Sequence, residues 1–179
     1  LSNGRSKKIV IFTKDGKYMY FTRSNYLKKK GKDQQGTTKL KLYRAELVKD
    51  KWTNIVELPF NNDSYSVAHP ALSKDEKLLF FASDMPGTIG SSDIFKVEIN
   101  DGHSSYGSPV NLGKTINTEG KDTFPFVDED GNLYFSTDGR PGLGGLDIYK
   151  SNIENGEFTD PINIGKPING KYDDFAFFM

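Results

Sequence analysis

The stretch Ser136–Lys150, STDGRPGLGGLDIYK, is a second copy of an earlier stretch, Ser83–Lys96, SDMPGTIGSSDIFK. The equivalent aspartates of the two copies, Asp93 and Asp147, lie 54 residues apart. A regular repeat of this length is typical of proteins built from stacked structural units. The repeat therefore predicts a chain of similar modules within a single domain that spans residues 1–179.

The repeat extends on both sides of this core. The stretch Ser108–Lys114 is copied by Asp160–Lys166, and Lys74–Ala82 has a fainter copy in Lys14–Thr22. Three units and the beginning of a fourth follow from these matches, with approximate bounds of 5–62, 63–119, 120–171 and 172–179. We align the start of the fourth unit by matching its Phe175 with Phe124 of the third unit, and with His69 of the second.

Each unit contains short apolar runs that are rich in aromatic and β-branched residues and bounded by Gly, Asp, Asn or Pro, a pattern typical of strands. The third unit has four such runs, at 123–127, 132–136, 146–152 and 158–164. Four strands per repeat are typical of a β-propeller blade, and propellers close with four to eight blades. We predict an all-β fold, a propeller segment of about three blades and the start of a fourth, from a ring of six to eight blades.

Tight turns are predicted between the first two strands of each unit. Asp15-Gly16 and Asp130-Gly131 place a glycine where a turn needs a positive φ. In the second unit Glu76 replaces the glycine, so we expect a different turn type or a looser loop there.

Charge and composition exclude several classes of function. Lys plus Arg and Asp plus Glu balance at 24 each, which argues against a nucleic-acid partner. No apolar run is long enough to span a membrane, and the chain has no cysteine, so thiol chemistry is excluded. A basic run at 27–36 is interpreted as a solvated loop, with an electrostatic contact to an acidic partner or polyanionic glycan as the alternative.

The residues offer little catalytic chemistry. We expect His69 to be a ring packed in an innermost strand and His103 to be a solvated loop residue. Asp84, Asp93 and their copies in the next unit are expected to accept backbone N–H bonds from the long connections. Neither a metal site nor a cofactor site nor a catalytic triad is predicted, because the two histidines lack suitably spaced partners.

Several stretches together resemble a known family. Tyr65–Asp75, Phe81–Gly87 and Gly139–Tyr149 are similar to the TolB-like, WD-repeat-like propeller of Bacteroidetes outer membrane protein A family proteins. The resemblance implies a periplasmic protein associated with the outer membrane and anchored to peptidoglycan through a domain absent from this chain. Relatives of this design serve type IX secretion and gliding, so the resemblance also implies a link to that machinery. It implies no catalytic residues.

From these observations we expect a non-enzymatic scaffold that binds protein partners of the outer membrane or periplasm. The alternatives are a glycan-binding propeller, with Trp52 as its best stacking residue, and the propeller domain of a lyase or peptidase. Loops on a rigid scaffold often carry the contacts to partners, and aromatic residues and Arg are the strongest anchors. The candidate partner-binding residues are Tyr26, Lys28, Lys29, Lys30, Met85 and Arg140.

Overall fold

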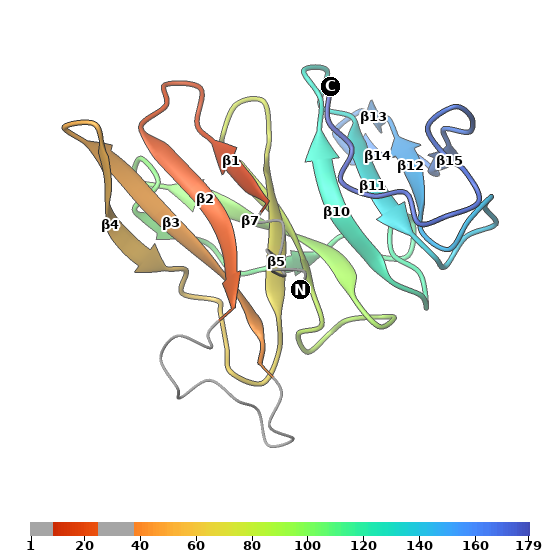
Figure 1. Ribbon diagram of the computed structural model, residues 1–179, viewed down its shortest axis with the longest axis horizontal. Helices are drawn as coiled ribbons and strands as arrows, with labels where there is room; N and C mark the ends of the chain where they lie inside the picture. The colour runs from red at the N-terminus through yellow and green to blue at the C-terminus, as the bar shows by residue number, and fades with distance from the viewer. Residues whose placement is uncertain (1–8, 25–37) are drawn as a thin grey trace, which may run out of the picture.

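The computed structural model describes residues 9–24 and 38–179, and within these ranges the regular elements are all strands (Figure 1). The first sheet contains β1 (Val10–Phe12), β2 (Tyr18–Ser24), β3 (Leu40–Val48) and β4 (Lys51–Glu57), in that order. The second contains β5 (Val67–Leu72), β6 (Leu78–Ser83), β7 (Asp93–Asn100) and β8 (Ser105–Tyr106), and β9 (Val110–Asn111) also pairs with β7. The third contains β10 (Asp122–Val127), β11 (Leu133–Thr137), β12 (Asp147–Ser151) and β15 (Ile162–Asn163).

Each of these sheets is an antiparallel meander, as expected for a propeller blade. The innermost strands lie next to one another, because β5 contacts both β1 and β10. The predicted all-β propeller fold is therefore confirmed. The described residues contain no helix long and apolar enough to cross a membrane.

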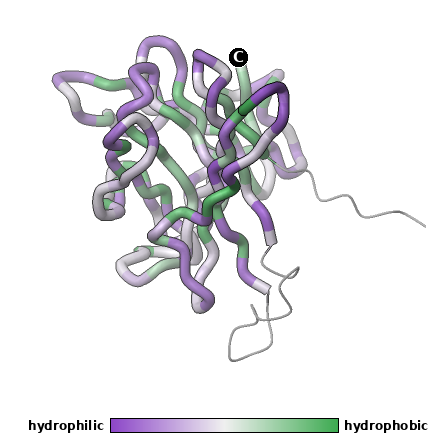
Figure 2. Tube along the Cα trace, turned by 90° about the vertical axis from the view of Figure 1, so that its left-hand side faces the viewer, coloured by the Kyte–Doolittle hydropathy of each residue, from purple (hydrophilic) through white to green (hydrophobic). Residues whose placement is uncertain are grey.

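Two hydrophobic clusters hold the blades together. The first lies between the first and second sheets and is built around Tyr20, Leu42, Phe81 and Phe95. The second lies between the second and third sheets and includes Ile94, Leu133 and Phe135. Figure 2 shows the matching pattern along the chain, with hydrophobic stretches in the strands and hydrophilic residues at many of the turns. Burial of these side chains is the main force that joins neighbouring blades.

The turn at Glu76 differs from the sequence-based expectation. Glu76 adopts a φ of 58° and its N–H bonds to Ser73 O at 2.9 Å, just as the N–H of Gly16 bonds to Thr13 O at 2.9 Å. The prediction of a different or looser turn is wrong, because the glutamate accepts the left-handed conformation that its glycine counterparts use. A non-glycine residue in this region is uncommon.

The last strand of the third unit also differs from the prediction. Glu157–Phe158 forms β14 and pairs with β13 (Ile153–Glu154), while only Ile162–Asn163 pairs with β12. The predicted single strand at 158–164 is thus split between a small hairpin and a short outer strand.

The start of the fourth unit lies one residue away from its predicted alignment. Asp174 N–H bonds to Leu146 O at 2.7 Å, as Asp122 N–H bonds to Ser92 O at 2.8 Å, so Asp174 is the equivalent of Asp122. Ala176, with a φ of 61°, then takes the place that we had assigned to Phe175. The sequence alignment gave the wrong register because aromatic residues occupy matching positions in both registers of this stretch.

Carboxylates hold the long connections, as predicted. Asp93 Oδ2 accepts the N–H of Ile89 at 2.7 Å, and Asp147 Oδ2 accepts the N–H of Leu143. Asp138 Oδ1 accepts the N–H of Lys121 at 2.6 Å. A carboxylate that accepts backbone N–H groups replaces the water these groups would otherwise bind.

An asparagine side chain closes each blade in a way that the sequence analysis did not anticipate. Asn117 Oδ1 accepts the N–H of Ile94 at 2.8 Å, and Asn117 Nδ2 donates to Ile94 O at 3.0 Å. Asn61 makes the same pair of bonds to Leu42, and Asn169 makes it to Ile148. The amide thus imitates a strand partner beside β3, β7 and β12.

Replacement of Asn117 by Ala should destabilise the protein. The variant loses both bonds to Ile94 and leaves a buried backbone donor and acceptor unpaired, at a cost of about 1–3 kcal/mol each. We expect the free energy of unfolding in urea to fall by about 2–4 kcal/mol. Asn100→Ala, at an exposed site on β7, is the control and should change it by less than about 0.5 kcal/mol. Equal stabilities of the two variants would refute this role of Asn117.

Candidate functional site

The inner edges of the blades line a concave surface of the described chain. Two adjoining cavities, of 380 and 980 Å³, lie along β1, β5, β10 and the C-terminal segment. The residues that line both cavities are Ile9, Val10, His69, Phe124, Ala176 and Phe178. A concave and largely apolar surface with few polar groups is the usual character of a small-molecule site.

His69 and Phe124 occupy equivalent bulges in neighbouring inner strands. The register of β5 with β6 shifts between Ala68 and Ala71, and that of β10 with β11 shifts between Thr123 and Phe126. The φ angles are 56° at His69 and 50° at Phe124, and a proline follows each. Bulges turn side chains out of the regular alternation of a strand, and they are common beside functional sites.

His69 is held by residues of both neighbouring blades. Thr22 Oγ1 in the first sheet accepts the backbone N–H of His69 at 2.9 Å. The ring nitrogen Nδ1 lies 2.8 Å from Thr123 Oγ1 in the third sheet, and the ring stacks on Phe124 with centroids 3.8 Å apart. The predicted packing of His69 in an innermost strand is confirmed.

Burial, together with the nearby positive charge of Lys121, lowers the pKa of His69 to about 4. The imidazole is therefore neutral at neutral pH. Among the described residues its Nε2 makes no hydrogen bond, and His69 lines both cavities.

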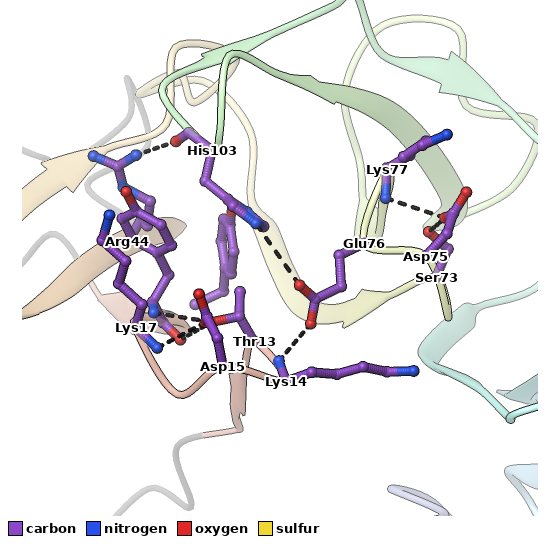
Figure 3. Close-up of polar contacts among 12 residues, drawn as sticks. Thr13, Lys14, Asp15, Lys17, Arg44, Ser73, Asp75, Glu76, Lys77 and His103 are labelled. Carbon is purple, nitrogen blue, oxygen red and sulfur yellow. Dashed lines mark hydrogen bonds and ion pairs between the residues drawn. The ribbon is translucent and has the colours of Figure 1, made fainter.

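A second polar cluster joins the first two blades at the turns (Figure 3). Glu76 Oε1 accepts the backbone N–H of Lys14 at 2.5 Å, and Glu76 Oε2 lies 3.9 Å from His103 Nε2. On its other side, His103 Nδ1 lies 2.9 Å from the hydroxyl of Tyr20. Arg44 donates to the carbonyl oxygen of His103. The left-handed Glu76 thus places its carboxylate across the boundary between two blades.

The interpretation of His103 as a solvated loop residue is wrong. Its side chain is 14% exposed, and its ring packs against Tyr18 with centroids 4.9 Å apart. Burial lowers the pKa of His103, and the carboxylate of Glu76 opposes this shift. Burial also raises the pKa of the Tyr20 hydroxyl, which stays protonated. Hydrogen bonds of Lys14, Tyr20 and Arg44 thus join this cluster across the two blades, and Glu76 lies near His103 within the second blade.

The candidate partner-binding residues lie in different surroundings. Met85 is 7% exposed and packs within the first hydrophobic cluster. Arg140 Nη2 donates to Thr115 O at 2.7 Å, so its guanidinium is tied to the neighbouring connection. Tyr26, Lys28, Lys29 and Lys30 lie outside the described residues, and their contacts stay predictions. Trp52, the candidate glycan-stacking residue, lies beside Phe12 with ring centroids 5.6 Å apart.

Metal ligands do not gather in the described part of the chain: residues 9–24 and 38–179 contain no group of three or more His, Cys, Asp or Glu side chains placed to hold an ion. The 380 Å³ cavity is bordered by charged side chains of the turns, and the 980 Å³ cavity by the carboxylates of Asp173 and Asp174. Hydrogen bonding to a ligand is the chemistry that this arrangement can offer.

No protein-family model and no curated protein matches the sequence. Solved structures do match. They include TolB from Acinetobacter baumannii, with 18% identity, a TM-score of 0.52, and coverage of 85% of this chain and 31% of TolB. The alpha-L-arabinofuranosidase from Lactobacillus brevis matches with 17% identity, a TM-score of 0.59 and coverage of 90% and 57%. The gluconolactonase XC5397 from Xanthomonas campestris matches with 16% identity, a TM-score of 0.55 and coverage of 91% and 48%.

These comparisons support a TolB-like propeller fold, and the chain spans from about a third to somewhat over half of the matched proteins. They also correct the functional prediction. The matched structures are mostly enzymes that carry propellers, including peptidases as well as sugar-acting proteins. The expectation of a non-enzymatic interaction scaffold is contradicted, and the alternative of a glycan-binding or enzyme-associated propeller is favoured.

His69 should make the stability of the protein depend on pH. The unfolded His69 takes up a proton near pH 6.5, whereas the folded one does so only near pH 4, so acid favours the unfolded state between these values. The contribution of His69 to the free energy of unfolding is complete above about pH 6.5. It falls by about 2–3 kcal/mol by about pH 4.5. Urea unfolding at several pH values should show this loss in the native protein relative to His69→Phe. Parallel pH profiles would contradict the assignment.

The contact between Glu76 and His103 can be tested by titration. Glu76→Gln removes the negative charge that favours protonated His103, so we expect the pKa of His103 to fall further below its usual value. Nuclear magnetic resonance of the imidazole signals measures it. Glu154→Gln, at an exposed site on β13, is the matched control and should leave the pKa of His103 unchanged. A rise in the Glu76→Gln variant would exclude the proposed geometry.

Proposed function

We propose that this chain forms part of the ligand-binding channel of a propeller that acts on a carbohydrate. The observation that carries the proposal is the aromatic wall along the inner strands, where Phe124, Phe175 and Phe178 line a cavity of 980 Å³ together with His69. Sugar rings present apolar C–H faces and polar hydroxyl edges, and a wall of aromatic rings with a few hydrogen-bonding groups complements both.

The exposed rings in this wall offer area for stacking. Phe175 stacks on Phe124 with centroids 5.0 Å apart, and 48% of its surface is exposed. Phe178 is 60% exposed. At the turn end, the 380 Å³ cavity reaches Lys14, Glu76 and Glu129, where Lys14 Nζ lies 3.6 Å from Glu129 Oε2. The 980 Å³ cavity is lined by these rings and by two carboxylates of the C-terminal segment, and the 380 Å³ cavity adds charged groups of the turns. In this proposal the rings stack on the sugar and the charged groups bind its hydroxyls.

The comparisons support a sugar ligand through the arabinofuranosidase and the gluconolactonase that share the fold. The chain spans 57% and 48% of those proteins, so we place on it a binding wall rather than the reacting groups. Glycoside hydrolysis in general uses a pair of carboxylates across the bond that is cleaved. In this proposal those groups come from the part of the ring that this chain does not span.

We also propose a periplasmic location and a place among the outer membrane protein A family proteins of Bacteroidetes. The supports are the sequence motifs Tyr65–Asp75 and Gly139–Tyr149 and the likeness to TolB. Recovery of the native full-length protein from the periplasmic fraction of its cells is the expected result, and recovery from the cytoplasm would contradict it.

Titration calorimetry of the full-length protein tests the proposed ligand class. The probes are arabino-oligosaccharides, gluconolactone and a proline-containing peptide. We expect a sugar to bind, and Phe175→Ala to weaken binding by about fivefold, because stacking on an aromatic ring contributes about 1 kcal/mol. Tyr172→Ala is the matched control, since Tyr172 is highly exposed and lies outside the cavity lining.

Two results would overturn the proposal. If the peptide binds and the sugars do not, the propeller belongs with the peptidase class. If Phe175→Ala and Tyr172→Ala bind the sugars equally well, the aromatic wall is not the binding surface.

A further inference from the structure

His69 and Phe124 are shared by three cavities of the described chain. Both line the two cavities described above, and both also line a third cavity of 410 Å³. The third cavity includes Ser66, Asp84 and Lys121 at the strand ends that lead into the long connections. The 380 Å³ cavity instead reaches the turns at Lys14 and Glu76. His69, in the middle of β5, therefore borders both the turn side and the connection side of the blades.

We infer that His69 is the polar anchor of this channel, and that its Nε2 forms a hydrogen bond to a hydroxyl group of the bound sugar. This inference rests on the proposed function and identifies the residue that recognises the ligand through a hydrogen bond. Phe124, in the same bulge of the next blade, has no polar atom in its side chain. The equivalent positions of neighbouring blades thus give the wall one apolar ring and one hydrogen-bonding ring.

The neighbouring blades fix the orientation of His69 before any ligand arrives. Thr22 holds its backbone, and Thr123 holds its Nδ1, at 2.9 and 2.8 Å. Stacking on Phe124 prevents rotation of the ring. A group that is already oriented loses little conformational entropy on binding, so its hydrogen bond contributes more to affinity and selectivity.

The chemistry of the imidazole matches a hydroxyl group better than an anion. Burial keeps the ring neutral, so Nε2 carries either one hydrogen or one lone pair, according to the tautomer. A hydroxyl group can donate to the lone pair or accept from the N–H, whereas a carboxylate can only accept. The position of Nε2 therefore favours neutral, hydroxyl-rich rings over acidic ones.

The test uses the full-length protein with arabino-oligosaccharide as the probe. The chain itself supplies the matched variant, because Phe124 shows that a phenylalanine fits this bulge before a proline. His69→Phe keeps the ring and its stacking but removes both nitrogens. We expect this variant to fold and to bind the probe about tenfold more weakly, as loss of one hydrogen bond in a desolvated site predicts.

A second measurement does not depend on the variant. In the native protein, the ¹⁵N signals of the His69 imidazole should shift on addition of the probe, while those of His103 should not. Thr123→Val, which removes the partner of Nδ1, should change the balance of His69 tautomers and weaken binding less than His69→Phe does.

The outcomes separate the two proposals. If the probe binds the native protein and His69→Phe equally well and the His69 signals do not move, the channel binds sugar but His69 is not its anchor. If no sugar binds the native protein, the proposed function fails and the role of His69 as a sugar anchor fails with it. If His69→Phe does not fold, the ¹⁵N shifts of the native protein decide the matter.

Discussion

The side-chain amides of Asn61, Asn117 and Asn169 are the constraint on which the blades depend. The outermost strands of the second and third sheets pair over only two residues, at Val110–Asn111 and Ile162–Asn163. Such short strands leave the backbone of β7 and β12 with unmet hydrogen-bonding groups at a buried edge, which is costly. The asparagine meets one donor and one acceptor at once, and so ends the sheet without another strand.

The inner edge of the blades is built differently. There the inner strands bulge at His69 and Phe124 and still pair with their neighbours on both sides of the bulge. The bulges carry the rings toward the axis, where His69, Phe124 and Phe175 stack in succession. The concave wall is thus lined by inner strands whose bulges recur from blade to blade, and the side chains at the bulged positions differ.

The repeat in the sequence was sufficient to predict the fold, because strand runs and turn residues are local signals. It also predicted the carboxylates that hold the connections, since a repeated Asp has a structural use in each unit. His103 and Glu76 could not be placed in the same way, because their contacts join different blades and leave no local pattern. The sequence did not predict that the asparagines pair with the strand backbone, because an Asn next to a turn can also bond within the turn or face solvent. The one-residue error at Phe175 arose because apolar patterns match equally well in two registers there.

The left-handed conformation of Glu76 also bears on which blades become neighbours. Similar repeats risk joining the wrong neighbour during folding, or exchanging with another copy of the chain. The glutamate at this turn contacts the first blade through the backbone N–H of Lys14, whereas Gly131 occupies the same place at the next boundary. The two boundaries therefore differ in the residue at this turn, which is glutamate at one and glycine at the other. If another blade took the place of the first, this carboxylate would lose its contact with the N–H of Lys14 even where the hydrophobic contacts were kept, so one side chain helps to distinguish the two boundaries.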